Sequence, residues 1–279
     1  MKNKQRLQLK IRRVLLGRRG LAVPVSFFIL FVSLLMVISA TYYFAVARVN
    51  SKSKQFNVLA AEQNILLLED SISDVSWSVD ASEIYEFDDC GGILKVKPNS
   101  AKLKINVVYG NSSDKIFDGF IGEVRYELYP AEYINVGSFL KGDSRVVVNK
   151  SGSELARLFI TNTNGKAEIV LHYRPLVLAI FDGYENGKPV NYIRVYVINL
   201  NSSQNMELQG EIPLKISCLN VYSEFYVYNF SQPISNLSIQ VAIGSDENSV
   251  SVPLESNQNG AIANFEVLVC RIRIEKLSR

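Results

Sequence analysis

The stretch GLAVPVSFFILFVSLLMVISATYYFAVA, residues 20–47, decides the architecture of this chain. It contains 28 consecutive residues without a charged side chain. An α-helix rises about 1.5 Å per residue, so about 20 apolar residues cross a hydrocarbon core that is about 30 Å thick. The stretch therefore predicts a transmembrane helix over residues 21–47, with Tyr42, Tyr43 and Phe44 at its outer interface.

Charge is distributed unevenly around this stretch. Residues 1–19 carry eight of the 30 Lys and Arg and no acidic residue, so 22 remain against 27 Asp and Glu and the rest sums to −5. An excess of Lys and Arg marks the cytoplasmic end of a membrane helix. We therefore expect residues 1–20 to form a basic cytoplasmic leader beside membrane lipid, and the C-terminal domain to lie outside the cell. Because the exported part is acidic, a nucleic-acid partner is not expected.

A cleaved secretory signal is an alternative, because Ala45-Val46-Ala47 has the small-x-small pattern of a cleavage site. The apolar core of such a signal spans about 7–15 residues, however, and this one is far longer. A buried helix of a soluble protein explains neither the length nor the uneven charge. A membrane-inserted helix is the interpretation that accounts for both.

The apolar pattern continues with helical spacing to about residue 72. At 100° per residue, one line, here called the Val49 line, consists of Val49, Phe56, Ala60 and Leu67, with Leu59 and Leu66 beside it. A second line on nearly the opposite side, here called the Ile65 line, consists of Val58, Ile65 and Ile72. We expect the Val49 line to dock on a globular head and the other face to meet a neighbouring subunit. A parallel coiled-coil dimer and a stalk with a few exposed aliphatic residues are the alternatives.

The pattern changes from helical to alternating at Gly92. Residues 48–90 are thus expected to form the amphipathic helix and an acidic connector, and residues 91–279 an extracellular β-domain. Leu94 and Val96 alternate with lysines, Pro98-Asn99-Ser100 suggests a turn, and Leu103–Tyr109 alternates again, which predicts a hairpin. Further alternating segments recur up to residue 274. The fold class is therefore predicted as α+β, a long N-terminal helix followed by a mostly antiparallel β-sandwich.

Cysteines and glycosylation sequons fall on the side expected to be exported. Cys218 and Cys270 each alternate with polar neighbours, so a bridge between them is a candidate disulfide that leaves Cys90 free; three buried thiols are the alternative. The Asn-X-Ser/Thr sequons, candidate sites of N-glycosylation, are at Asn111, Asn149, Asn201, Asn229 and Asn236.

Few residues point to catalysis, so neither an enzymatic activity nor a cofactor is expected. His172 is the only histidine and lies in an alternating strand, which argues against a His-based triad and a multi-histidine zinc site. The acidic residues 69–89 do not match a calcium-binding loop, so no metal site is expected. Aromatic residues that suggest a carbohydrate-stacking surface, or a strand with one buried face, are Tyr222, Phe225, Tyr226 and Tyr228.

The entry to the membrane segment reads Arg18-Arg19-Gly20-Leu21-Ala22-Val23-Pro24-Val25. It resembles the class III signal peptide of archaeal type IV pilins and archaellins, in which a basic pair and a glycine directly precede the hydrophobic helix. The resemblance covers about 30 residues and implies cleavage by a prepilin peptidase between Gly20 and Leu21. Many bacterial pilins carry a glutamate at the position of Val25, whereas many archaeal members lack it.

Two interpretations of function follow. The first is a non-catalytic pilin-like subunit of the cell surface, whose helix packs with copies of itself or with other pilin-like subunits. The second is a permanently anchored extracellular β-domain that binds a glycan or a protein.

Overall fold

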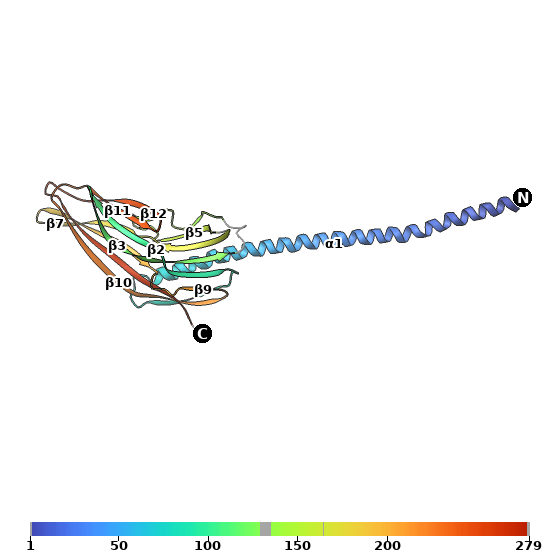
Figure 1. The fold of residues 1–279 in the computed structure, drawn as a ribbon, viewed down its shortest axis with the longest axis horizontal. Coiled ribbons are helices and arrows are strands. Elements are labelled where there is room, and N and C mark those ends of the chain that lie inside the picture. The colour runs from blue at the N-terminus through green and yellow to red at the C-terminus, as the bar shows by residue number, and fades with distance from the viewer. Residues whose placement is uncertain (1, 129–134, 164, 278–279) are drawn as a thin grey trace. The chain divides into compact units, whose positions relative to one another are not determined.

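The computed structural model describes residues 2–128, 135–163 and 165–277, with side chains described from residue 23 onward. The chain divides into two compact units, Met1–Phe56 and Asn57–Arg279. The helix α1 (Lys2–Val75) begins in the first unit and supplies the first residues of the second (Figure 1). It ends slightly beyond the predicted end, at Val75.

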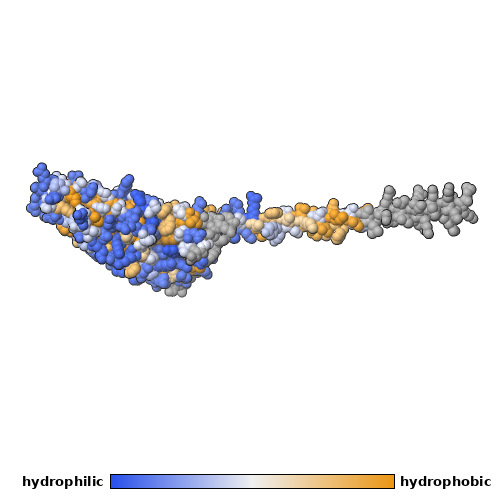
Figure 2. Space-filling model, turned by 45° about the horizontal axis from the view of Figure 1, so that its top comes forward, coloured by the Kyte–Doolittle hydropathy of each residue, from blue (hydrophilic) through white to orange (hydrophobic). Residues whose placement is uncertain are grey.

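In the first unit, α1 is the membrane candidate. Among the described residues, the helix Val23–Val75 is the one that is long and apolar enough to cross a bilayer. Its large apolar side chains between Val23 and Phe56 are exposed, apart from the half-buried Val32, and Figure 2 shows hydrophobic residues gathered along this part of the helix. The structure is thus consistent with anchoring of this chain in a membrane.

The second unit contains the strands. They are β1 (Ser82–Phe87), β2 (Ile93–Tyr109), β3 (Ser112–Leu128), β4 (Phe139–Lys141), β5 (Ala156–Thr163), β6 (Lys166–Tyr173), β7 (Leu176–Glu185), β8 (Lys188–Asn199), β9 (Met206–Leu208), β10 (Ile212–Phe230), β11 (Asn236–Ile243), β12 (Asp246–Pro253) and β13 (Ala261–Lys276).

These strands form two sheets. The first has the order β1-β10-β13-β8-β7, and the second has the order β12-β11-β2-β3-β6-β5-β4 with β9 paired to β2. Among the described strands, the β13–β8 pair is the one parallel ladder; an isolated parallel bridge joins Val148 to Leu176 of β7. The predicted fold class, a long helix followed by a mostly antiparallel β-sandwich, is therefore confirmed.

Two apolar cores lie between the sheets. The first core, here called the helix-side core, combines Ile65 and Leu68 of α1 with residues of both sheets, such as Leu158 on β5 and Leu214 on β10. The second has no member from α1: it combines strand residues, which include Val195, Phe265, Ile105 and Val241, with a few residues between strands such as Val147. The end of α1 thus takes the place that a direct sheet-to-sheet contact occupies in the second core.

The predicted hairpin around Pro98 is wrong. The segment forms one continuous strand, β2, which pairs with β3 on both sides of an irregularity between Lys97 and Ala101. Proline lacks an N–H and is tolerated where ladder bonding is interrupted, so Pro98 lies at a bulge and not at a chain reversal. In contrast, Asn186 and Gly187, with φ of 50° and 79°, make the two-residue turn between β7 and β8.

The domain boundary also differs from the expected one. The compact second unit begins at Asn57 and not at residue 91, because the last turns of α1 and the strand β1 belong to its core. Strand β1 lies within residues 48–90, the segment expected to be an amphipathic helix and an acidic connector, and it pairs with β10. Glu83 and Glu86 flank Ile84 and Tyr85 along this edge strand.

Candidate functional site

The two apolar lines of α1 have different surroundings. Residues of the Ile65 line are buried in the helix-side core, with Ile65 and Ile72 fully buried and Val58 exposed by 8%. The expectation that the Val49 line docks on the head is therefore wrong. The physical reason is that both lines are apolar, and only the surface that each line meets distinguishes them.

The residues of the Val49 line are exposed in each of the two units, whereas Leu66 beside the line packs against the helix-side core. Val49 is exposed by 67%, Phe56 by 68% and Leu67 by 42%, and Leu59 beside them is exposed by 59%. Burying one such side chain stabilises a contact by about 1.5–3 kcal/mol. Several of them on one side of a helix, outside the apolar segment itself, form a surface suited to another helix.

A buried ion pair fixes the docked side of α1. The Glu69 carboxylate accepts a hydrogen bond from the Lys141 ammonium on β4, and Tyr173 on β6 donates to it over 3.4 Å. Burial raises the pKa of Glu69, and the Lys141 charge opposes this rise. Lys141 also contacts Asp70 at 3.2 Å, so one lysine holds two successive acidic residues of the helix.

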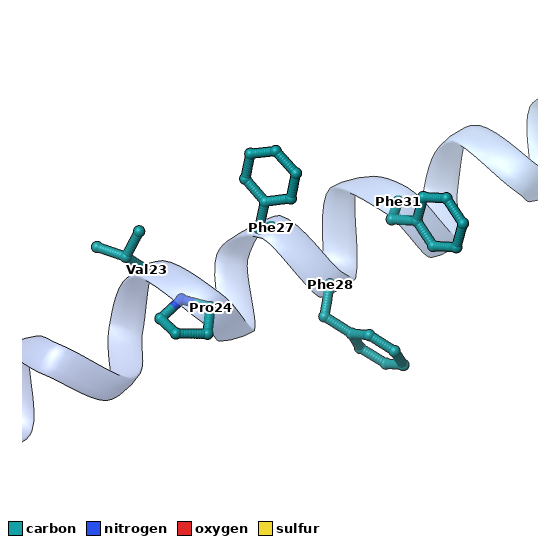
Figure 3. Close-up of a pocket in the computed structure, with 5 residues that line it drawn as sticks. All are labelled: Val23, Pro24, Phe27, Phe28 and Phe31. Atoms are coloured by element: carbon teal, nitrogen blue, oxygen red, sulfur yellow. The ribbon is translucent and has the colours of Figure 1, made fainter.

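The apolar segment presents a second surface on a single helix. A hollow is lined by Val23, Pro24, Phe27, Phe28 and Phe31, and Figure 3 shows these side chains projecting from α1 with no other element beside them. Their exposed fractions are consistent with contact to lipid or to another apolar helix.

The residues of the proposed processing site lie on the backbone of α1. Arg18, Arg19, Gly20 and Leu21 belong to this helix, and their side chains lie outside the described ones. Pro24 lies inside the helix. Its missing N–H removes the bond to the carbonyl group four residues earlier, which is that of Gly20.

The structure brings Cys218 and Cys270 together and keeps Cys90 with other partners. The Cys218 and Cys270 sulfur atoms are 3.6 Å apart in the helix-side core, and both are present as free thiols. The Cys90 sulfur accepts a hydrogen bond from Asn64 Nδ2 at 3.2 Å.

The five sequons differ in exposure. Asn111, Asn229 and Asn236 are exposed, whereas Asn149 and Asn201 are half-buried. The Asn149 side chain donates to the Ser251 carbonyl, and Ser203, which completes the Asn201 sequon, is buried and accepts a hydrogen bond from the Ile274 N–H. The exposed three are therefore the more accessible acceptors.

A polar cleft of about 250 Å³ lies between β3 and β10 in the second unit. Its aromatic lining includes Phe120, Tyr222 and Tyr226, and its polar lining includes Asp118 and Glu224. Hydrogen bonds from Lys102 and Lys115 lower the pKa of Asp118 to about 2. The cleft thus combines a carboxylate that is paired with two lysines and partly exposed aromatic rings.

The four aromatic residues of β10 that were expected to share a surface have different surroundings. Tyr222 and Tyr226 line the cleft, and the Tyr226 hydroxyl donates to the Ile116 carbonyl at 3.0 Å. Tyr228 packs edge-on against Phe265, with ring centroids 5.4 Å apart. Phe225 is exposed by 67% and alternates to the other face of the strand. Phe120 of β3 also lines the cleft. The sequence pattern of β10 gives no indication of this residue.

His172 has structural contacts. It lies on β6, its ring is edge-on to Phe159 with centroids 5.5 Å apart, and burial lowers its pKa to about 3. Within the described part of the chain, no group of three or more His, Cys, Asp or Glu side chains is arranged to hold a metal ion.

Comparison with known proteins adds no relative: no family model, no curated protein and no solved structure matches this sequence significantly. The function is therefore argued from the helix and the head themselves.

Proposed function

We propose that this chain is a non-catalytic, pilin-like structural subunit of the cell surface, inserted in the membrane by α1 and assembled with copies of itself through the same helix. The observation that carries the proposal is the exposed Val49 line. A helix that served only as an anchor needs apolar residues within the bilayer. It has no use for a further apolar face that continues past the membrane segment on the side opposite to its docked face.

Two surfaces on α1 support assembly. Phe27, Phe28 and Phe31 project from the apolar segment (Figure 3). Phe56 and Leu67 are exposed apolar residues further along the helix. When helices leave the bilayer for a filament, these side chains lose lipid as a partner and require one another. Contacts of this kind hold a bundle of parallel helices together.

The position of Pro24 supports processing after Gly20. In a helix that starts at Leu21, Pro24 falls in the first turn, where the N–H groups have no intrahelical partner. In an uncleaved helix the same proline lies in the interior and costs about 3 kcal/mol. Cleavage by a prepilin peptidase would thus leave a helix with a compatible start.

Mass spectrometry of the protein from native membranes or filaments tests the processing step. We expect Leu21 as the N-terminal residue, and Gly20→Phe should block maturation while Gly17→Phe leaves it intact. Surface-exposed copies that all retain Met1 would contradict the pilin-like interpretation and leave a permanent anchor.

A double variant tests the assembly face. Phe56→Ser with Leu67→Ser is expected to reduce the filament fraction, measured by electron microscopy and sedimentation, at least tenfold. Gln55→Ser, an exposed polar position off the Val49 line, is the matched control. Since both apolar residues are exposed, the unfolding of the head, followed through the single tryptophan Trp77, should not change. Dimers in place of filaments would favour a coiled-coil stalk.

The β3–β10 cleft supports a second function, binding of a glycan by an anchored head. Sugar rings stack on aromatic faces, and carboxylate and amide groups bind their hydroxyls. Phe120 is exposed by 53% and Tyr222 by 36%, next to Asp118 and Glu224. Those groups have the chemistry required to hold a neutral oligosaccharide.

Immobilised neutral hexose and N-acetylhexosamine oligosaccharides test this second function. Phe120→Ala with Tyr222→Ala should weaken binding at least tenfold. Phe225→Ala, which removes an exposed ring from the opposite face, is the control. Equal binding by all variants, or none by the unaltered protein, would remove the cleft as a glycan site.

A further inference from the structure

Cys218 and Cys270 lie beneath the turn that joins α1 to the head. Cys218 is on β10 and Cys270 on β13, which are neighbouring antiparallel strands with a register shift between Cys218 and Asn220. Cys218 pairs with Ile272, and Cys270 lies two residues from Ile272 on the same face of its strand. Both thiols therefore lie in the helix-side core, exposed by 1% and 0%. Their sulfur atoms are 3.6 Å apart.

The turn above them depends on both cysteines. The Trp77 N–H donates to the Cys270 sulfur at 3.3 Å. The Asp80 N–H donates to the Cys218 carbonyl at 3.0 Å, and the Cys218 N–H donates to the Ala81 carbonyl at 2.9 Å. Trp77 and Asp80 have φ of 69° and 65°, which side chains with a Cβ rarely adopt, so these bonds hold an unfavourable backbone conformation.

We infer that Cys218 and Cys270 form a disulfide that fastens the α1-to-head turn to the β10–β13 seam. The inference rests on the proposed export of the head, because an oxidising compartment is where such bridges persist. Cys90 stays a thiol, since its sulfur is engaged with Asn64 and Asp88. In an assembled subunit, the bridge would lie where a pull on the helix reaches the sheets.

The bridge forms by exchange with an oxidised dithiol of the thiol–disulfide oxidoreductase class. One cysteine thiolate attacks a sulfur of the donor disulfide and releases one donor thiol; the second cysteine thiolate then displaces the other. The pair loses two protons and two electrons, and the donor gains them as two thiols. Burial raises the pKa of Cys270 to about 12, so exchange belongs to a stage before the helix covers the sulfur.

Thiol counting on the native full-length protein tests the inference. Alkylation under denaturing conditions without reductant should label Cys90 alone, and reduction beforehand should expose all three. Peptide mapping should find the fragments of Cys218 and Cys270 joined. Three alkylated thiols in unreduced protein would overturn the inference. Protease or biotin labelling of whole cells measures export separately, so a failed bridge in an exported head is distinguishable from a failed export.

Variants add a second measurement. Cys218→Ser with Cys270→Ser should lower the melting temperature of the head by about 10 °C, because the bridge closes a long loop in the unfolded chain. Cys90→Ser is the control and should leave the bridge in place. A melting temperature of the double variant equal to that of unreduced protein would contradict a bridge.

Discussion

The two sides of α1 are similar in sequence and opposite in surroundings. Within the second unit, Ile65 and Ile72 on one side are fully buried between the sheets; on the other, Leu59 and Leu67 are exposed by 59% and 42%. Both sides repeat with helical spacing and both are apolar. The comparison shows that an apolar line on a helix indicates contact, while the identity of the contact comes from the shape and composition of the opposing surface.

Substitutions on the two sides should give the largest contrast. Ile65→Ala is expected to lower the free energy of unfolding of the head by about 3–4 kcal/mol, since it leaves a cavity in the helix-side core. Leu67→Ala removes a similar volume from an exposed position and should change it by less than about 0.5 kcal/mol. Urea unfolding of detergent-solubilised protein, followed by Trp77 fluorescence, measures both. Equal losses would show that the exposed side is also covered.

The ion pair on the docked side should give a pH-dependent effect. Lys141→Met removes the partner of the buried Glu69 and is expected to cost about 3 kcal/mol at pH 7. Without the lysine charge, nothing from Lys141 opposes the rise in the pKa of Glu69 that burial causes. A buried carboxyl group with a raised pKa is neutral below that pKa, and the folded state loses stability as pH rises and the group ionises. The loss should therefore be smaller at pH 5. Lys150→Met, at an exposed loop lysine, is the control, and a pH-independent loss would contradict this role.

A smaller effect of opposite sign should come from the sheet. The folded pKa of His172 is lowered to about 3 from an ordinary value of 6.5, so the unfolded chain takes up the proton first as pH falls. Stability is complete above the unfolded pKa and decreases below it, by about 2 kcal/mol between pH 7 and pH 5. The free energy of unfolding of His172→Leu, measured between pH 7 and pH 5, should fall less with decreasing pH than that of the unaltered protein. An unchanged slope would assign the acid sensitivity to other groups.

Much of the fold was predictable from local patterns. The uncharged run after Gly20 predicts the membrane helix, and the alternation after Gly92 predicts β-structure. Asn186-Gly187 makes a turn because asparagine followed by glycine suits two positive φ angles, whereas Asp182-Gly183, which has similar turn chemistry, lies within β7 at a register shift. The hairpin predicted at Pro98 was wrong for a related reason. The missing N–H of proline excludes regular strand pairing, but a bulge satisfies that condition as well as a turn does.

The candidate sites were less predictable. The alternation of Cys218 and Cys270 predicts that both face the core, yet the pairing of β10 with β13 that brings their sulfur atoms to 3.6 Å has no signal in the sequence. The cleft joins Phe120 of β3 to Tyr222 of β10, two residues far apart in the chain. The processing residues Arg18 and Gly20 stay a prediction, because their role depends on a peptidase and not on contacts within the chain.

The sequence by itself determined the elements: an apolar helix long enough for a bilayer, a basic leader before it and a β-rich region after it. These follow from backbone hydrogen bonding and from the transfer of side chains out of water, which act residue by residue. Only the tertiary structure decided that the Ile65 line is docked, that the Val49 line is free and that two cysteines lie beneath the turn after α1. Those outcomes depend on which distant surfaces meet, and no local period encodes them.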